Sequence, residues 1–192
     1  MLAEPVSGGI AMRSAPSIIL SILLSASAAA LLGGCAAKVR TAPSAPLAFS
    51  AESSSAIVLN LSGTASATGS PDWTPLLAEW VKAMTESSDA ANVRSSVQEG
   101  AARPTGEPGT LVSVYVNRFR YVAPGSRYAG GVITGNAHLD VTVRFLDLRT
   151  GQQLGERAYK VSSSAMEGIF SAMTDKQVRA MAKDIVAEIS RR

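Results

Sequence analysis

The sequence predicts an α+β fold, with a mostly antiparallel sheet of about four or five strands and two main helices packed on one face. The first observation behind this prediction is the order of the elements: a strand and a helix are followed by a run of strands and a final helix. The second is that the strand segments are rich in Val, Tyr and Phe at alternating positions. The third is that each helix segment carries one apolar stripe, which needs a sheet face to cover it.

The first half of the predicted domain contains one strand and one long helix. Residues 56–61 are a short apolar, β-branched run that is typical of a strand, and residues 62–70 resemble a linker. Ser70-Pro71-Asp72 is a helix-start signal for a helix that runs to about Ser88. Its apolar residues recur three and four positions apart, which favours burial in the core over an aromatic binding surface: Trp73, Leu76, Leu77, Trp80, Val81 and Met84.

The middle of the domain is predicted to be a meander of strands. Residues 111–122, 136–148 and 153–162 alternate apolar and polar side chains, and the tight turn at 150–152 joins the last two. Residues 93–98 fit a short edge strand, and residues 100–109, with their Gly and Pro residues, fit a loop.

The C-terminal segment is predicted to be helical. Thr174 to Gln177 matches a capping box, with a hydroxyl at the cap and Gln three residues later. Residues 165–173 fit a short preceding helix or turn. The final helix presents a buried stripe to the sheet, formed by Val178, Met181, Ala182, Ile185 and Ile189.

The composition excludes several classes of protein. Of the 192 residues 46% are hydrophobic, too many for a chain that is disordered throughout. One cysteine cannot make a disulfide scaffold, and a single long apolar run cannot make a polytopic membrane protein. The formal net charge is only +3, so we predict no nucleic-acid partner.

The N-terminal 34 residues have the layout of a secretory signal peptide. Arg13 provides the positive start, residues 15–32 provide the apolar core, and small residues precede Cys35. Translation from Met12 gives a tighter signal than translation from Met1, and both starts stay open.

The segment Leu32-Gly33-Gly34-Cys35 resembles the lipobox of bacterial lipoprotein precursors. The resemblance implies that Cys35 is acylated, that the signal is cut before it, and that a lipid anchor holds the protein on a membrane. Residues 36–37 lack the Asp that retains such proteins in the inner membrane, which implies the periplasmic face of the outer membrane of a Gram-negative cell. Residues 35–55 are then the lipidated Cys and a flexible tether, and residues 56–192 a single periplasmic α+β domain.

Two alternatives to the lipobox remain. The apolar run would just span a bilayer as an uncleaved helix, or Cys35 is an ordinary residue after an ordinary signal peptide. The body of the chain, residues 111–189, is also similar to domains of uncharacterised Gram-negative envelope lipoproteins. The segments that carry this similarity are residues 120–125, 147–151 and 171–177.

The strand at 136–148 offers one candidate polar site. His138, Asp140 and Arg144 lie on one side of the strand and alternate with apolar residues on the other. In the catalytic hypothesis His138 is a base, Asp140 orients it, and Arg144 holds an anion. In the alternative they form the solvated face of a half-covered sheet. One His and an acylated Cys are too few ligands for an ordinary zinc site, so we predict neither a metal nor a cofactor.

The loop at 123–136 offers a candidate contact surface. It holds four glycines with Arg127 and Tyr128, residue types that often carry interface energy. Together with Arg127, the neighbouring Arg118, Arg120 and Arg144 make this end basic, so it could contact lipid phosphate or an acidic partner. A long hairpin connection with a solvated rim is the alternative.

These features together predict an outer-membrane lipoprotein with a non-catalytic periplasmic domain that binds an envelope protein as an accessory of envelope or secretion assembly. One alternative is a small envelope hydrolase that uses His138 and Asp140. The other is a purely structural lipoprotein.

Overall fold

The computed structural model describes residues 40–41, 46–120, 137–162 and 173–191. The chain divides into two units, Met1–Cys35 and Ala36–Arg192, and the described residues all belong to the second. The signal segment, Cys35, the loop at 123–136 with Arg127 and Tyr128, and most of the segment at 165–173 lie outside the described residues. No helix in the described part of the chain is long and apolar enough to cross a membrane.

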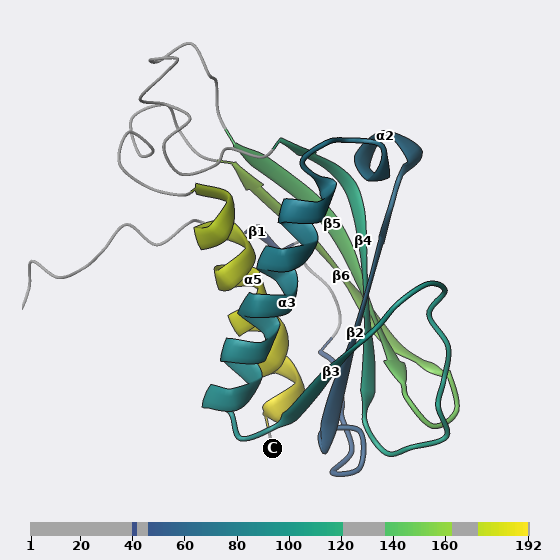
Figure 1. Ribbon diagram of the computed structural model, residues 1–192. Coiled ribbons are helices and arrows are strands. Elements are labelled where there is room, and N and C mark those ends of the chain that lie inside the picture. The colour runs from purple at the N-terminus through teal and green to yellow at the C-terminus, as the bar shows by residue number, and fades with distance from the viewer. Residues whose placement is uncertain (1–39, 42–45, 121–136, 163–172, 192) are drawn as a thin grey trace, which may run out of the picture. The chain divides into compact units, whose positions relative to one another are not determined.

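A six-stranded sheet forms the centre of the domain, in the order β1-β6-β5-β4-β2-β3 (Figure 1). β1 has only two residues, so the sheet has five substantial strands, and the predicted α+β class is confirmed. The strands are β1 (Arg40–Thr41), β2 (Ala56–Gly63), β3 (Arg94–Gln98), β4 (Thr110–Arg120), β5 (His138–Asp147) and β6 (Gln153–Ser162).

Antiparallel pairing prevails in the sheet, as predicted. β4, β5 and β6 form the expected antiparallel meander, and β1 adds to the edge of β6. β2 instead runs parallel to both β3 and β4. Parallel neighbours need a crossover connection, and helix α3 (Trp73–Ala90) provides it between β2 and β3.

Helices α3 and α5 (Met173–Ser190) lie side by side on one face of the sheet (Figure 1). The predicted stripe of α5 is completely buried. The predicted stripe of α3 is buried at Leu76, Trp80 and Met84 and only partly buried at its other three positions. The core lies between these helices and the apolar side of the strands, where Val112, Val141 and Val143 are fully buried.

The predicted starts of the helices differ from the observed ones. The N-cap of α3 is Asp72 rather than Ser70, and it makes no side-chain cap hydrogen bond. α5 begins at Met173, one residue before the predicted cap. The side chain of Gln177 is fully buried without a hydrogen-bond partner among the described residues, so the predicted capping box does not close.

The predicted linker at 62–70 is also wrong. β2 extends to Gly63, and a short helix, α2 (Ala65–Thr68), follows it. The side chain of Thr64 caps α2 by accepting a hydrogen bond from the backbone of Ala67. The sequence pattern did not predict this helix, because its residues are small and form no apolar stripe.

Residues 46–55 belong to the folded domain, although the sequence placed them in the flexible tether. Leu47 and Phe49 pack against the core, and the ring of Phe49 meets that of Phe145 edge-on at 5.6 Å. Gly155 makes room for this segment, because a Cβ there would lie 2.0 Å from Leu47 Cδ2. We call residues 46–55 the strap.

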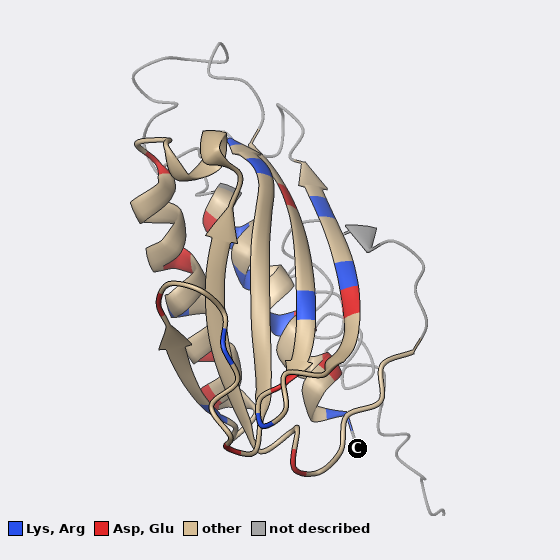
Figure 2. Ribbon diagram, turned by 90° about the vertical axis from the view of Figure 1, so that its right-hand side faces the viewer, with Lys and Arg blue, Asp and Glu red and all other residues tan. Residues whose placement is uncertain are grey.

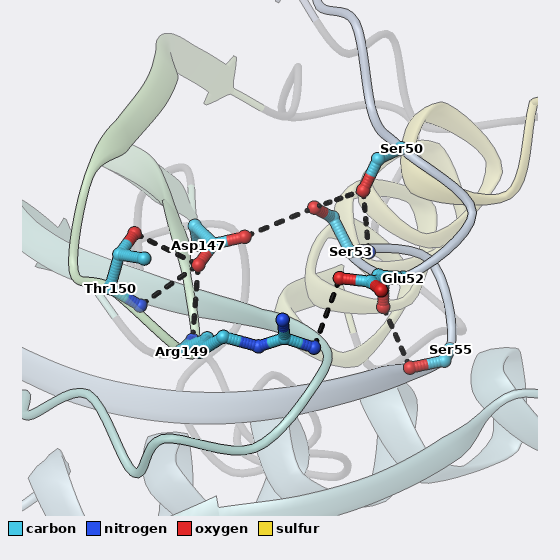
Figure 3. A network of polar contacts seen from close by, with 7 residues as sticks. All are labelled: Ser50, Glu52, Ser53, Ser55, Asp147, Arg149 and Thr150. Atoms are coloured by element: carbon cyan, nitrogen blue, oxygen red, sulfur yellow. Dashed lines mark hydrogen bonds and ion pairs between the residues drawn. The ribbon is translucent and has the colours of Figure 1, made fainter.

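Polar contacts fix the end of the strap to the turn between β5 and β6 (Figure 3). Asp147 accepts hydrogen bonds from the Ser53 hydroxyl at 3.3 Å and from the backbone and hydroxyl of Thr150, each at 2.9 Å. These hydrogen bonds lower the pKa of Asp147, with those from Thr150 contributing most. Arg149 pairs with Glu52 at 3.0 Å.

Candidate functional site: the open face of the sheet

The face of β4, β5 and β6 that points away from α3 and α5 carries the candidate site (Figure 2). Because strand side chains alternate, residues next to the buried core positions must point to this side. We call it the outer face, and it is formed by Ser113, Tyr115, Arg118, Arg120, His138, Asp140, Thr142, Arg144, Glu156 and Lys160.

The loop at 99–109 covers only one end of this side of the sheet. Thr105 donates its backbone N–H to the carbonyl of Leu148, and Asn60 donates to the carbonyls of Gln98 and Gly100. Beneath the loop lies a small apolar cluster that contains Leu111 and Leu148. The rest of the outer face has no element over it in the part of the chain that the structure describes (Figure 2).

The Asp140 carboxylate contacts two side chains of neighbouring strands. Lys160 on β6 lies 3.6 Å from its Oδ2, and Asn117 Nδ2 donates to its Oδ1 at 3.2 Å. Asn117 lies where the register between β4 and β5 shifts, and it also donates to the Thr142 hydroxyl at 3.0 Å. The register shift therefore directs the Asn117 amide toward the Asp140 carboxylate, the group that orients His138 in the catalytic hypothesis.

His138 lies at the start of β5, opposite Arg120. Partial burial lowers its pKa most, the charges of Arg118 and Arg120 lower it further, and the charge of Asp140 raises it. Its Nε2 has no hydrogen-bond partner among the described residues, and no hydrogen bond joins it to Asp140. The two side chains therefore do not form an oriented pair.

The cations of the outer face fall into two groups. Arg144 pairs with Glu156 at 3.1 Å. The guanidinium that would hold an anion in the catalytic hypothesis therefore already binds a carboxylate of the protein. Arg118 and Arg120 are exposed, and no carboxylate lies within 4 Å of either in the described segments. No group of three or more potential metal-ligating residues occurs among the residues that the structure describes.

Tyr115 is a feature of the outer face that was not predicted from the sequence. It is 41% exposed near the middle of the outer face, between Ser62 on β2 and Thr142 on β5. Lys160 and Glu156 were missed as well. The alternation of β4 and β6 could have placed all three on the polar side, but only the register brings them beside β5.

The domain belongs to the class of α+β domains whose helices cover one face of the sheet and leave the other open. No family model matches the sequence, and no curated protein matches it. Among solved structures it resembles the PelC dodecamer from Paraburkholderia phytofirmans, with 14% identity over 81% of this chain and 98% of that chain, and a TM-score of 0.48.

Two further solved structures are similar. Protein XCC0632 from Xanthomonas campestris is 12% identical over 78% of this chain and 90% of that chain, with a TM-score of 0.45. Lipoprotein GNA1162 from Neisseria meningitidis is 11% identical over 68% of this chain and 97% of that chain, with a TM-score of 0.42. At these identities the likenesses concern the fold alone.

Proposed function

We propose that this protein is an outer-membrane lipoprotein, anchored through lipid on Cys35, whose periplasmic domain binds an envelope protein and does not catalyse a reaction. The lipobox supports the anchor, since the chain's one cysteine ends its one long apolar run. The observation that carries the binding role is the outer face, which is open around Tyr115. The partner would be a component of envelope or secretion assembly.

The surroundings of Tyr115 suit protein recognition. Its neighbours across the sheet, Ser62 and Thr142, are small, so the aromatic ring can reach a partner without competition from longer side chains. Tyrosine is enriched among the residues that carry binding energy at protein interfaces. The Arg144–Glu156 pair lies nearby and supplies a polar rim.

Metabolic labelling tests the anchor. Cells that express the protein are fed an alkyne fatty acid, and the intact mass and membrane fraction of the product are measured. We expect label on the wild type, a mature chain that starts at Cys35, and location in the outer membrane; Cys35→Ser should lose the label and retain the signal. An unlabelled wild type that keeps its apolar run would instead support the uncleaved helix and contradict the anchor.

Site-specific photo-crosslinking in intact cells tests the binding face. A photoreactive amino acid replaces Tyr115 in one strain and Val97 in a control strain; Val97 is 46% exposed on edge strand β3. We expect a discrete protein adduct from position 115 and none from position 97. Absence of an adduct at 115 contradicts the proposal and favours a purely structural lipoprotein, whereas an adduct with twice the chain mass identifies a second copy as the occupant.

A further inference from the structure

The cations at one end of the outer face carry an inference about the membrane. We propose that Arg118, Arg120 and Lys160, which we call the basic end, dock on the lipid phosphates of the bilayer that holds the anchor. The inference rests on the proposed lipidation of Cys35. It decides between the two ligands that the sequence left open for this end, lipid phosphate and an acidic protein.

A row of paired residues connects the basic end to the N-terminal chain. Arg40 of β1 lies opposite Lys160, Lys160 lies opposite Asp140, and Asp140 lies opposite Arg118. Neighbouring strands are about 4.8 Å apart, so the three steps from β1 to β4 cover about 14 Å. The point where the chain joins the sheet and the basic end are therefore at the same end of the strands.

The covalent chain limits how far this end can lie from the anchor. Arg40 follows Cys35 by five positions. Even a fully extended chain of five residues spans at most about 18 Å. The pairing of β1 with β6 removes most of the freedom that a tether over residues 35–55 would have given the domain. A lipid on Cys35 therefore keeps the basic end within reach of the bilayer surface.

The charges at this end suit a surface of phosphates. Arg118 and Arg120 lack a carboxylate partner in the described segments, and Asp140, already shared between Lys160 and Asn117, opposes them only in part. Guanidinium groups bind phosphate oxygens in a bidentate manner. Basic residues close to a lipid chain add to anchoring, because acyl chains and cations act as separate membrane signals.

Fluorescence quenching of the lipidated full chain in vesicles tests the proposal. Since the acylated Cys35 has no free thiol, a single introduced cysteine can be labelled selectively, at Ser162→Cys near the basic end or at Gln153→Cys at the other end of β6. The vesicles contain phosphatidylethanolamine and phosphatidylglycerol, with a nitroxide quencher on a headgroup. We expect quenching several-fold stronger at position 162 than at position 153.

Charge-reversal variants make the test specific. R118E/R120E should reduce quenching at position 162 at least twofold, and added salt should do the same in the wild type. The control R94E/R103E makes the same charge change at exposed sites away from the basic end and should leave the quenching unchanged.

Two results would overturn the inference alone: equal quenching at both positions, or quenching at position 162 that R118E/R120E does not alter. A wild type that fails to float with the vesicles would overturn the anchor and this inference together, so the two failures are distinguishable.

Discussion

Two neighbouring residues of β6, Glu156 and Arg157, point to opposite faces of the sheet, and each forms an Arg–Glu pair. On the outer face Glu156 meets Arg144, with side chains 45% and 61% exposed. On the inner face Arg157 meets Glu188 of α5, with side chains 7% and 18% exposed. Both pairs join an arginine to a glutamate, and they differ in burial and in the number of hydrogen bonds that they make.

The inner pair lies where charges have lost most of their water. Arg157 Nε donates to both carboxylate oxygens of Glu188, at 3.1 and 3.3 Å. Burial and then the negative charges of Glu188 and Asp184 raise the pKa of the neighbouring Tyr159. Burial also raises the pKa of Asp184. Desolvation therefore governs this side of β6, whereas water screens the outer pair.

Breaking the inner pair should have the largest effect on stability. Glu188→Leu leaves the Arg157 guanidinium buried without its counter-charge, which costs about 3–5 kcal/mol of unfolding free energy. Urea denaturation measures the loss. The double variant R157M/E188L removes both charges and should recover most of it, so a double variant as unstable as Glu188→Leu would contradict the account.

The strap gives the next largest expected effect. Phe49→Ala removes a partly buried ring from Phe145 and the core, and should cost about 2 kcal/mol, less than for a fully buried ring. Ala48→Ser changes the exposed residue next to it and should leave urea denaturation unchanged. Two equally neutral substitutions would mean that residues 46–55 behave as the tether that the sequence predicted.

His138 gives a smaller effect that depends on pH. Its pKa is lowered in the folded state, so the unfolded chain binds a proton more readily. The contribution of His138 to the free energy of unfolding is therefore fully present above about pH 6.5 and is lost as the pH falls toward the folded-state pKa. As His138 is the chain's one histidine, NMR titration reports its pKa without overlap. R118Q/R120Q should raise this pKa, and Arg94→Gln should not. An unmoved pKa in R118Q/R120Q would show that these guanidiniums do not act on the imidazole.

The periodic spacing of apolar residues predicted which parts of the strands and of the last helix form the core. The stripe of α5 and the alternation of β4 to β6 identified the core because apolar spacing is local. The strap escaped prediction, because Leu47 and Phe49 lie among Pro, Ala and Ser and have no period. Their place depends on space left by Gly155, more than 100 positions away, which no local pattern encodes.

The candidate site was predicted only in part for the same reason. Alternation placed His138, Asp140 and Arg144 on one side of their strand, and the register sets them opposite Arg120, Arg118 and Ser113 of β4. Alternation could not show that Lys160 and Asn117 bind the Asp140 carboxylate, or that Glu156 pairs with Arg144. Those contacts depend on the register between strands. The pair between Glu188 and Arg157 likewise depends on how α5 packs against β6, which the spacing along either element does not encode.

The outer pair should show the smallest effect. Arg144→Gln breaks a pair whose members both stay hydrated, so the loss should be within about 0.5 kcal/mol, and a double-mutant cycle with Glu156→Gln should give a coupling of similar size. Urea denaturation of the purified domain measures both. A coupling above about 1 kcal/mol would mean that another copy already excludes water from the outer face. The coupling could also be small in the purified protein and rise once the crosslinked partner is bound. That result would place the Arg144–Glu156 pair inside the interface that we assign to Tyr115, because only desolvation can make this exposed pair resemble the buried one.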